Sequence, residues 1–179
     1  MQTPFLIGTR LYLRPLDRTD APLLAAFVNH PETRRTVLRP RPTSLMQEEA
    51  FLMQLGSSER DIMFGLALRE GGSLVGVSGL HQLDNVGRKA QLGLLIGLAE
   101  QWGKGYGTEA TRLMLEYAFT TLNLNKVGLQ VFSNNPAARR VYEKAGFRLE
   151  GTLREDYFVD GAYVDTLCMG VLRSEWRRG

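Results

Sequence analysis

The sequence contains little cysteine and little histidine. Cys168 is the one cysteine among the 179 residues, and the two histidines, His30 and His81, are far apart. A lone cysteine cannot form an internal disulfide, and two distant histidines do not have the spacing of a zinc site. We therefore expect neither a disulfide nor a bound metal.

Long hydrophobic runs are absent as well. No apolar run reaches the roughly 18 residues that a membrane-spanning helix needs. The first residues, Met1 to Phe5, lack the basic segment and apolar stretch of a signal peptide. The sequence therefore predicts a cytoplasmic protein without a membrane partner.

The chain has the size and composition of one globular domain. Its 179 residues are 44% hydrophobic, which is enough to form a sizeable core. It contains no internal repeat, low-complexity tract or linker, so we expect a single domain over residues 1–179.

The net charge of +3 is unevenly distributed. Basic residues gather in one short segment and at the end of the chain: Arg34, Arg35, Arg39, Arg41, Arg173, Arg177 and Arg178. Such clusters suit a partner with several negative charges, either a nucleic acid or a cofactor with several phosphates. A solvated basic face that aids solubility would give the same pattern.

Hydrophobic periodicity predicts a mixture of helices and strands. Strands are predicted at residues 11–16, 62–69, 73–80, 90–98, 127–132, 152–159 and 163–171. Helices are predicted at residues 20–28, 44–55, 109–122 and 136–145. Asp20 and Ser44 are expected to cap the first two helices, and the Arg/Pro-rich segment 39–42 between these helices is expected to be a loop.

Three glycines at alternate positions, Gly103, Gly105 and Gly107, directly precede the helix at 109–122. The missing side chains let a phosphate approach the backbone, and unpaired amides at a helix start bind its negative charge. The segment therefore predicts a pyrophosphate site, although a tight strand-to-helix turn could use the same glycines.

Two other phosphate-binding motifs do not fit this segment. A Walker loop continues with Lys-Ser/Thr, whereas Lys104 is followed by Gly105. A dinucleotide fingerprint needs glycine at the position of Thr108, and an acidic residue about twenty positions later, where Leu129 and Gln130 stand. Both nucleotide-binding interpretations are therefore disfavoured.

Segment 102–107 resembles the pyrophosphate loop of the GNAT superfamily of N-acetyltransferases, Arg/Gln-x-x-Gly-x-Gly/Ala, with Trp102 at the position of the usual Arg or Gln. Segment 135–147 is similar to a second family motif, Asn-x-x-Ser/Ala-x-x-x-Tyr-Glu-Lys-x-Gly-Phe. Segments 10–16 and 149–165 resemble the branch of ribosomal-protein N-terminal (alanine/serine) acetyltransferases. The resemblance therefore covers nearly the whole chain.

The resemblance implies the GNAT fold, a mixed α+β domain. Its central sheet would be mostly antiparallel, with about seven strands flanked by helices and splayed between the fourth and fifth strands. Acetyl-coenzyme A (acetyl-CoA) would enter at the splay as cosubstrate. Its pyrophosphate would lie on the loop made of Gly103, Lys104, Gly105, Tyr106, Gly107 and Thr108.

Tyr142 is the predicted general acid. Acetyl transfer to an amine needs a neutral amine, a stabilised oxyanion and a proton for the departing thiolate. The resemblance places Tyr142 beside the cofactor sulfur, and a packed aromatic next to Phe147 is the alternative. Asn135 is expected to cap a helix and could also bind the pantetheine.

Further cofactor contacts follow from the resemblance. Around Leu95, Ile96 and Gly97, the family's fourth strand bulges and exposes backbone donors to the pantetheine and the acetyl oxygen. Arg139 could reach the adenosine 3′-phosphate, or it could be a solvated helix residue.

The general base is harder to predict. Many relatives carry a glutamate at the position of Gln91, whose amide cannot accept a proton. Glu155 is our candidate, with Asp156 or a chain of waters as alternatives. Cys168 lies in an apolar strand, where an inert thiol is expected, so we favour direct transfer over an acetyl-cysteine intermediate.

The acceptor amine is expected to lie beneath segment 34–41. Positive charge there disfavours a polyamine and suits a protein or peptide N-terminus with acidic neighbours, although polyamine or antibiotic acetylation stays open. A non-catalytic acyl-CoA sensor would be expected to have lost Tyr142. Residues 32–43 contain no aromatic residue for base stacking, which disfavours a DNA or RNA partner. Dimers are common in the family that the chain resembles, so a homodimer is a possible assembly.

Overall fold

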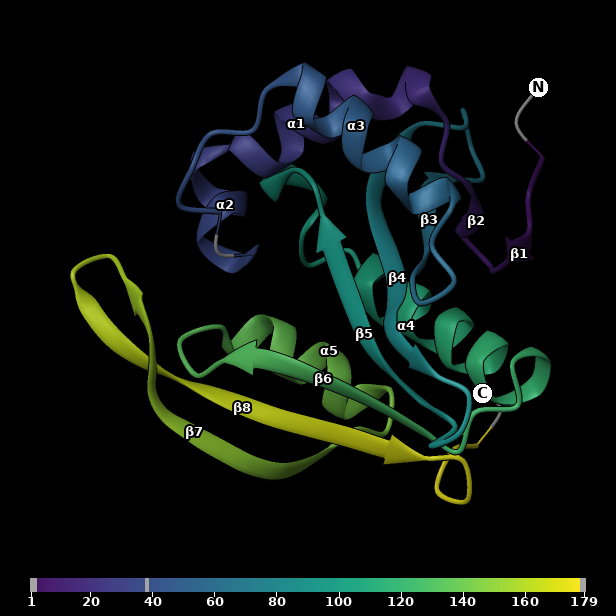
Figure 1. Cartoon of the computed structure of the whole chain (residues 1–179), viewed down its shortest axis with the longest axis vertical. Helices are drawn as coiled ribbons and strands as arrows, with labels where there is room; N and C mark the ends of the chain where they lie inside the picture. Colours follow the sequence, from purple (N-terminus) through teal and green to yellow (C-terminus); the bar gives the residue numbers. More distant parts are fainter. Residues whose placement is uncertain (1–2, 38, 178–179) are drawn as a thin grey trace.

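The computed structural model describes residues 3–37 and 39–177, which form one mixed sheet of eight strands in the order β1-β2-β3-β4-β5-β6-β8-β7 (Figure 1). The strands are β1 (Leu6–Ile7), β2 (Leu11–Pro15), β3 (Ile62–Leu68), β4 (Leu74–Asp84), β5 (Lys89–Ile96), β6 (Lys126–Phe132), β7 (Arg148–Val159) and β8 (Ala162–Leu172). Neighbouring strands are antiparallel except for β5 and β6. The predicted mostly antiparallel sheet is confirmed, with β1 as a short additional strand.

Helices cover both faces of this sheet, with α1 and α3 over one face and α4 and α5 over the other (Figure 1). The helical elements are η1 (Arg18–Asp20), α1 (Ala21–Asn29), α2 (Pro31–Val37), α3 (Leu45–Gly56), η2 (Ala99–Gln101), α4 (Tyr106–Glu116), η3 (Tyr117–Thr121) and α5 (Pro136–Lys144). Alternate residues of β5 serve the two faces: Leu92 packs in the cluster with α4, and Leu95 packs with Phe27 of α1. In the described part of the chain, no helix is both long and apolar enough to cross a membrane.

The chain enters α1 through a buried ion pair. Arg14 in β2 donates two hydrogen bonds of 2.8 Å to the carboxylate of Asp20, and both side chains are almost fully buried. Asp20 also accepts a hydrogen bond from the amide of Asp17 at 2.8 Å. Its carboxylate therefore ties β2 to the start of α1. The sequence had suggested that this side chain caps the helix, but it makes no capping hydrogen bond to α1.

Helix α2 lies in a segment for which no helix was predicted, and the predicted loop at residues 39–42 follows it. Pro31 begins the helix, a position at which proline is favoured. Thr33 is fully buried, and its hydroxyl donates a 2.8 Å hydrogen bond to the carbonyl of Gly97 just after β5. Arg34 and Arg35 are exposed on the same helix. A mostly polar helix of this length has too few apolar residues to show a helical period, which explains why periodicity missed it.

Strands β5 and β6 run side by side for a short distance and then separate. The parallel register pairs Lys89 with Lys126, Ala90 with Val127 and Gln91 with Gly128. Beyond these pairs the two ribbons diverge toward α2 (Figure 1). They correspond to the fourth and fifth predicted strands, so the predicted splay is confirmed.

Candidate functional site

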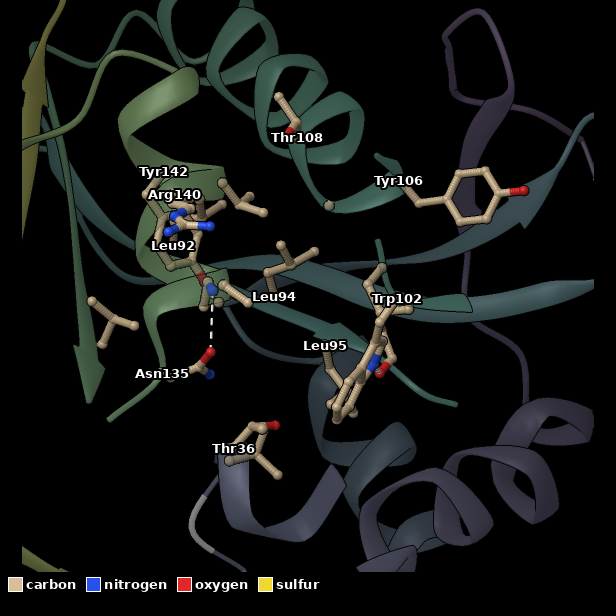
Figure 2. A pocket seen from close by; sticks show the side chains of 18 of the residues that line it. Thr36, Leu92, Leu94, Leu95, Trp102, Tyr106, Thr108, Asn135, Arg140 and Tyr142 are labelled. Atoms are coloured by element: carbon tan, nitrogen blue, oxygen red, sulfur yellow. Dashed lines mark hydrogen bonds between the residues drawn. The ribbon is translucent and has the colours of Figure 1, made fainter. Parts of the chain in front are cut away.

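The separation of β5 and β6 forms a cavity of about 820 Å³. Its walls come from these two strands, from α5 and from the glycine-rich loop before α4, with α2 on the opposite side (Figure 2). The predicted cofactor contacts that line it are Leu95, Ile96, Gly103, Gly105, Tyr106, Gly107, Thr108, Asn135 and Tyr142. A cavity of this size can bury most of a cofactor-sized molecule.

The glycine-rich loop turns sharply into α4. Gly103 and Gly105 have left-handed backbone conformations, with φ angles of 73° and 82°, which other residues rarely adopt. Gly107 does not have a left-handed conformation, and a Cβ there would lie at ordinary contact distances of 3.4–3.5 Å from Leu94 and Val141, so the fold does not require glycine at this position. The first amides of α4 have no partner within the helix, and the residues that carry them line the cavity.

Glu109 and Arg10 fasten this loop to β2. The carboxylate of Glu109 accepts hydrogen bonds from the backbone amides of Arg10 and Leu11. The guanidinium of Arg10 donates to the carbonyl of Lys104 and lies 5.3 Å from the ring centroid of Tyr106. Burial alone would raise the pKa of Glu109, but the hydrogen bonds from Arg10 and Leu11 outweigh it and the pKa is lowered. The carboxylate therefore stays ionised at neutral pH.

Trp102 closes one edge of the cavity. Its indole Nε1 donates a 3.0 Å hydrogen bond to the carbonyl of Ile96 at the end of β5. Figure 2 shows the indole ring along the cavity beside Leu95. The aromatic ring therefore replaces the usual polar side chain of this loop position with an apolar surface.

The backbone of β5 presents donors to the cavity. The amide of Gly97 donates to the carbonyl of Val75 in β4 at 2.8 Å, so this amide points toward β4. Amides alternate in direction along an antiparallel strand. The amide of Leu95 therefore also points toward β4, and the amides of Leu94 and Ile96 point to the open edge. The register is continuous here, so the predicted bulge is wrong. The divergence of β6 opens the edge instead.

Tyr142 lies at the base of the cavity on α5 (Figure 2). Its side chain is 7% exposed and packs against Phe147, with ring centroids 5.9 Å apart. Burial raises the pKa of Tyr142 to about 12, so the hydroxyl is protonated at neutral pH and can donate. The packing role and the donor role are therefore compatible.

Asn135 caps α5 and also lines the cavity. Its Oδ1 accepts a 3.1 Å hydrogen bond from the amide of Ala138, drawn as the dashed line in Figure 2. The cap uses only the side-chain oxygen. The Nδ2 donors are therefore left for a ligand, which fits both roles expected from the sequence.

Arg139 points away from the cavity. Its Nε donates a 2.7 Å hydrogen bond to Glu143, one turn further along the exposed side of α5. Arg140 and Lys144, which are also one turn apart, line the cavity instead. Consecutive residues of a helix point about 100° apart, because one turn takes 3.6 residues. Arg140 is therefore better placed than Arg139 to bind a phosphate.

Glu155 and Asp156 lie outside the cavity. Both are exposed, and among the described lining residues Tyr157 is the one from β7. Glu155 stands where the register of β7 and β8 is interrupted, with a φ of 51° and an amide that donates to Asp165 at 2.9 Å. The geometry gives no support to Glu155 as the general base.

Gly97, Lys104 and Cys168 are likewise outside the set of described residues that line the cavity. Gly97 allows α1 to approach the sheet, because a Cβ there would collide with the ring of Phe27. The backbone carbonyl of Lys104 accepts a hydrogen bond from the guanidinium of Arg10. Cys168 is half-buried in β8, rather than fully buried.

Part of the cavity wall could not be recognised from the sequence. Thr36 and Val37 of α2 line it, although α2 itself was not predicted. Phe132 and Tyr157 line it as an aromatic pair, with ring centroids 5.2 Å apart. Across residues 3–37 and 39–177, no group of three or more His, Cys, Asp or Glu side chains could hold a metal ion.

The fold, the splay and the glycine-rich loop define the class of protein. Residues 10–148 match the acetyltransferase (GNAT) domain family. The chain therefore belongs to the GNAT family, as the resemblance of its motifs had indicated.

Individual relatives agree with this assignment. The chain is 32% identical to the uncharacterized N-acetyltransferase YoaA of Bacillus subtilis, over 95% of this chain and 97% of YoaA. It is 41% identical to the B. subtilis protein named "Putative ribosomal N-acetyltransferase YdaF", over 59% of this chain and 57% of YdaF. The crystal structure of spermidine N-acetyltransferase from Vibrio cholerae with CoA and spermine has a TM-score of 0.87 and 28% identity, covering 94% of this chain and 98% of that chain. The protein is an N-acetyltransferase.

Proposed function

We propose that the protein transfers the acetyl group of acetyl-CoA directly to a primary amine, that of a protein or peptide N-terminus. The observation that carries the proposal is the cavity between β5 and β6. The glycine-rich loop, strand-edge donors and the hydroxyl of Tyr142 meet there from separate elements. These are the groups that acyl transfer from a thioester requires.

The cofactor would lie along the cavity in an extended form. Its pyrophosphate would bind the amides of residues 106–108 at the start of α4, where the helix dipole favours negative charge. Arg140 and Lys144 would bind the 3′-phosphate. The pantetheine would pair with the open edge of β5 and with Asn135, as a strand would.

The reaction would use the open donors of β5 and Tyr142. The amide of Leu94 or Ile96 would stabilise the oxyanion that forms when the amine attacks the thioester carbonyl. Tyr142 would donate a hydrogen bond to the sulfur. Because its pKa of about 12 lies above the value near 8.5 of an ordinary thiol, Tyr142 would stabilise the departing thiolate as a hydrogen-bond donor and would pass its proton to the sulfur only as it takes one from the attacking nitrogen.

The entrance favours a peptide acceptor over a polyamine. Arg34, Arg39 and Arg41 are exposed and are close in sequence to Thr36 and Val37, which line the cavity. Arg35 pairs with Asp160 at 3.3 Å and links α2 to the β7–β8 hairpin. This positive charge would repel a polyamine and attract acidic residues after a peptide N-terminus. A polyamine is the second candidate, favoured by the similarity to the V. cholerae spermidine enzyme.

Calorimetry and thiol release test the proposal together. We expect acetyl-CoA to bind and free thiol to form when peptides with N-terminal serine or alanine are added. Spermidine and an aminoglycoside are the comparison acceptors. Thiol release with spermidine alone would favour the polyamine candidate, and failure to bind acetyl-CoA would refute the proposal.

A further inference from the structure

A second cavity, of about 180 Å³, lies on the face of the sheet covered by α1 and α3. It shares with the larger cavity the residues Val37, Gly93, Leu94 and Leu95. The two cavities therefore meet at the open edge of β5. The titratable side chains on the wall of the smaller cavity are Arg39, Glu48 and His81.

A hydrogen bond to Asp61 orients the imidazole of His81. Its Nδ1 lies 3.1 Å from Oδ1 of Asp61, and the hydroxyl of Ser58 donates to Oδ2 of Asp61 at 2.8 Å. Burial alone would raise the pKa of Asp61, but the hydrogen bonds from Ser58 and His81 outweigh it and the pKa is lowered. The ionised carboxylate can only accept, so Nδ1 carries the hydrogen. Nε2 of the neutral imidazole therefore keeps its lone pair.

Two glycines leave room for this imidazole on the sheet surface. Nε2 of His81 lies 2.9 Å from the position that a Cβ on Gly93 would occupy, and 3.2 Å from that of Gly79. Gly93 lines both cavities and directly precedes Leu94, whose amide points to the open edge. Nε2 is thus positioned near the point where the acetyl carbonyl would meet the amine.

Glu48 adds a buried negative charge to the same cavity. It lies on the inward side of α3 with Phe51 and Leu52, and it is 5% exposed. Within the part of the chain that the structure describes, its carboxylate has no hydrogen-bond partner, and Arg39 is the charge that acts on it. Such a carboxylate is costly to bury without a partner. A cationic ligand would compensate it.

We propose that the smaller cavity receives the acceptor amine, with His81 as the general base and Glu48 as the group that attracts the ammonium. Asp61 is a positioning residue that acts through His81. The titratable groups that face His81 from neighbouring elements are Asp61, Glu48 and Arg39. Gln91, which lies opposite His81 on β5, is neutral. The inference rests on the proposed function and adds the base that function lacks.

The proton balance is simple. Nε2 takes one proton from the ammonium, and the neutral amine forms the C–N bond with the acetyl carbon. The C–S bond breaks with its electron pair on sulfur. The second proton of the amine nitrogen then protonates the thiolate through Tyr142, and the imidazolium releases its proton to solvent. The products are the N-acetyl amine and the free thiol of CoA.

His81→Gln is the first test, with acetyl-CoA and either a peptide with N-terminal serine or spermidine as acceptor. We expect kcat/KM for the acceptor to fall about 100-fold, with an unchanged Kd for acetyl-CoA. The residual rate should keep rising with pH, because the amine must then lose its proton in solution. In His81→Ala, added imidazole should restore part of the rate. An unchanged kcat/KM and pH profile in His81→Gln would overturn the assignment.

Two further variants separate the roles. Asp61→Asn should lower kcat and change the pH profile without changing the Kd for acetyl-CoA, and it carries the test if His81→Gln does not fold. Glu48→Gln should raise KM for the amine several-fold with little change in kcat. Glu49→Gln, on the outer side of α3, is its matched control. An unchanged KM in Glu48→Gln would show that Glu48 does not attract the ammonium. Failure of the unmodified protein to bind acetyl-CoA would instead refute the proposed function.

Discussion

The carboxylate of Glu109 in α4 accepts hydrogen bonds from the backbone amide of Arg10 at 2.7 Å and from its Nε at 3.0 Å. The same guanidinium donates to the carbonyl of Lys104 in the glycine-rich loop. Two residues far apart in the sequence thus hold both the loop and the first turn of α4 against β2. This arrangement fixes the loop amides before a cofactor arrives, which reduces the entropy lost on binding.

Glu109→Gln should weaken both stability and acetyl-CoA binding. We expect the free energy of unfolding at pH 7 to fall by about 1–2 kcal/mol, because hydrogen bonds to a charged group are lost. The pKa of Glu109 is lowered in the folded state, so its stabilisation is present above the unfolded pKa near 4.3 and is lost as the pH falls through the lower folded value. Urea unfolding at several pH values should show the two proteins converging in acid. Glu70→Gln, at an exposed position, is the control.

Gly105→Val should abolish acetyl-CoA binding. Gly105 has a φ of 82°, and a Cβ there would lie 2.9 Å from Nη2 of Arg10. Gly71 has a similar φ of 78°, and a Cβ there would meet no atom within 4 Å. Both valine variants should lose about 1–2 kcal/mol of stability from left-handed strain, but only Gly105→Val should lose binding in calorimetry. Full binding by that variant would disprove the loop assignment.

Short sequence motifs predicted the parts of the site whose conformation is set by a few neighbouring residues. The loop glycines and the cap by Asn135 depend on a few neighbouring residues, and both are found where the sequence placed them. The mostly antiparallel sheet and its splay followed from the family resemblance. The splay between β5 and β6 was therefore expected in the correct place.

Features set by tertiary packing could not be predicted from the sequence. Arg139 and Arg140 are equally plausible phosphate ligands until the direction of α5 is known. Polar α2 is held by Thr33 bonding to the distant Gly97, a contact that leaves no periodic pattern. Asp61, directly before β3, pairs with His81 of β4 through space, so neither residue is conspicuous in the sequence.

Tyr142→Phe should lower turnover and leave cofactor affinity nearly unchanged. The hydroxyl is the only group removed, and the ring still packs against Phe147. We expect kcat to fall about 100-fold, with the same Kd for acetyl-CoA by calorimetry. Because the pKa of Tyr142 is about 12, its ionisation should not limit the rate of the unmodified enzyme up to about pH 10. Tyr157→Phe, also at the cavity, is the matched control, and equal losses in both variants would argue against a special role for Tyr142.

Arg140→Ala should weaken CoA binding through the 3′-phosphate. We expect about a tenfold loss of affinity for CoA, as for removal of one charge-assisted hydrogen bond, and little change for 3′-dephospho-CoA. Arg139→Ala should bind both ligands as the unmodified protein does, because its guanidinium pairs with Glu143 outside the cavity. The reverse result would restore Arg139 as the phosphate ligand predicted from the sequence.

Glu48→Gln should make the protein more stable at neutral pH. Burial raises the pKa of Glu48, with the charge of Arg39 acting in the opposite direction. A raised carboxyl pKa means that stability is greatest below the unfolded value near 4.3 and is lost as the pH rises through the folded value. The amide removes that loss, so we expect a gain on the order of 1 kcal/mol at pH 7 and no difference at pH 4.

The control for this prediction is Glu49→Gln, because Glu49 pairs with the exposed Arg18 at 3.1 Å and should contribute little. Urea unfolding of both variants at pH 4 and pH 7 separates a buried charge from a surface one. A gain in stability together with a raised KM for the amine would mean that Glu48 is retained for binding at the expense of stability, as is common at functional sites. A loss of stability at pH 7 would instead show that the carboxylate is satisfied in the folded protein, and the attraction of an ammonium to this cavity would lose its physical basis.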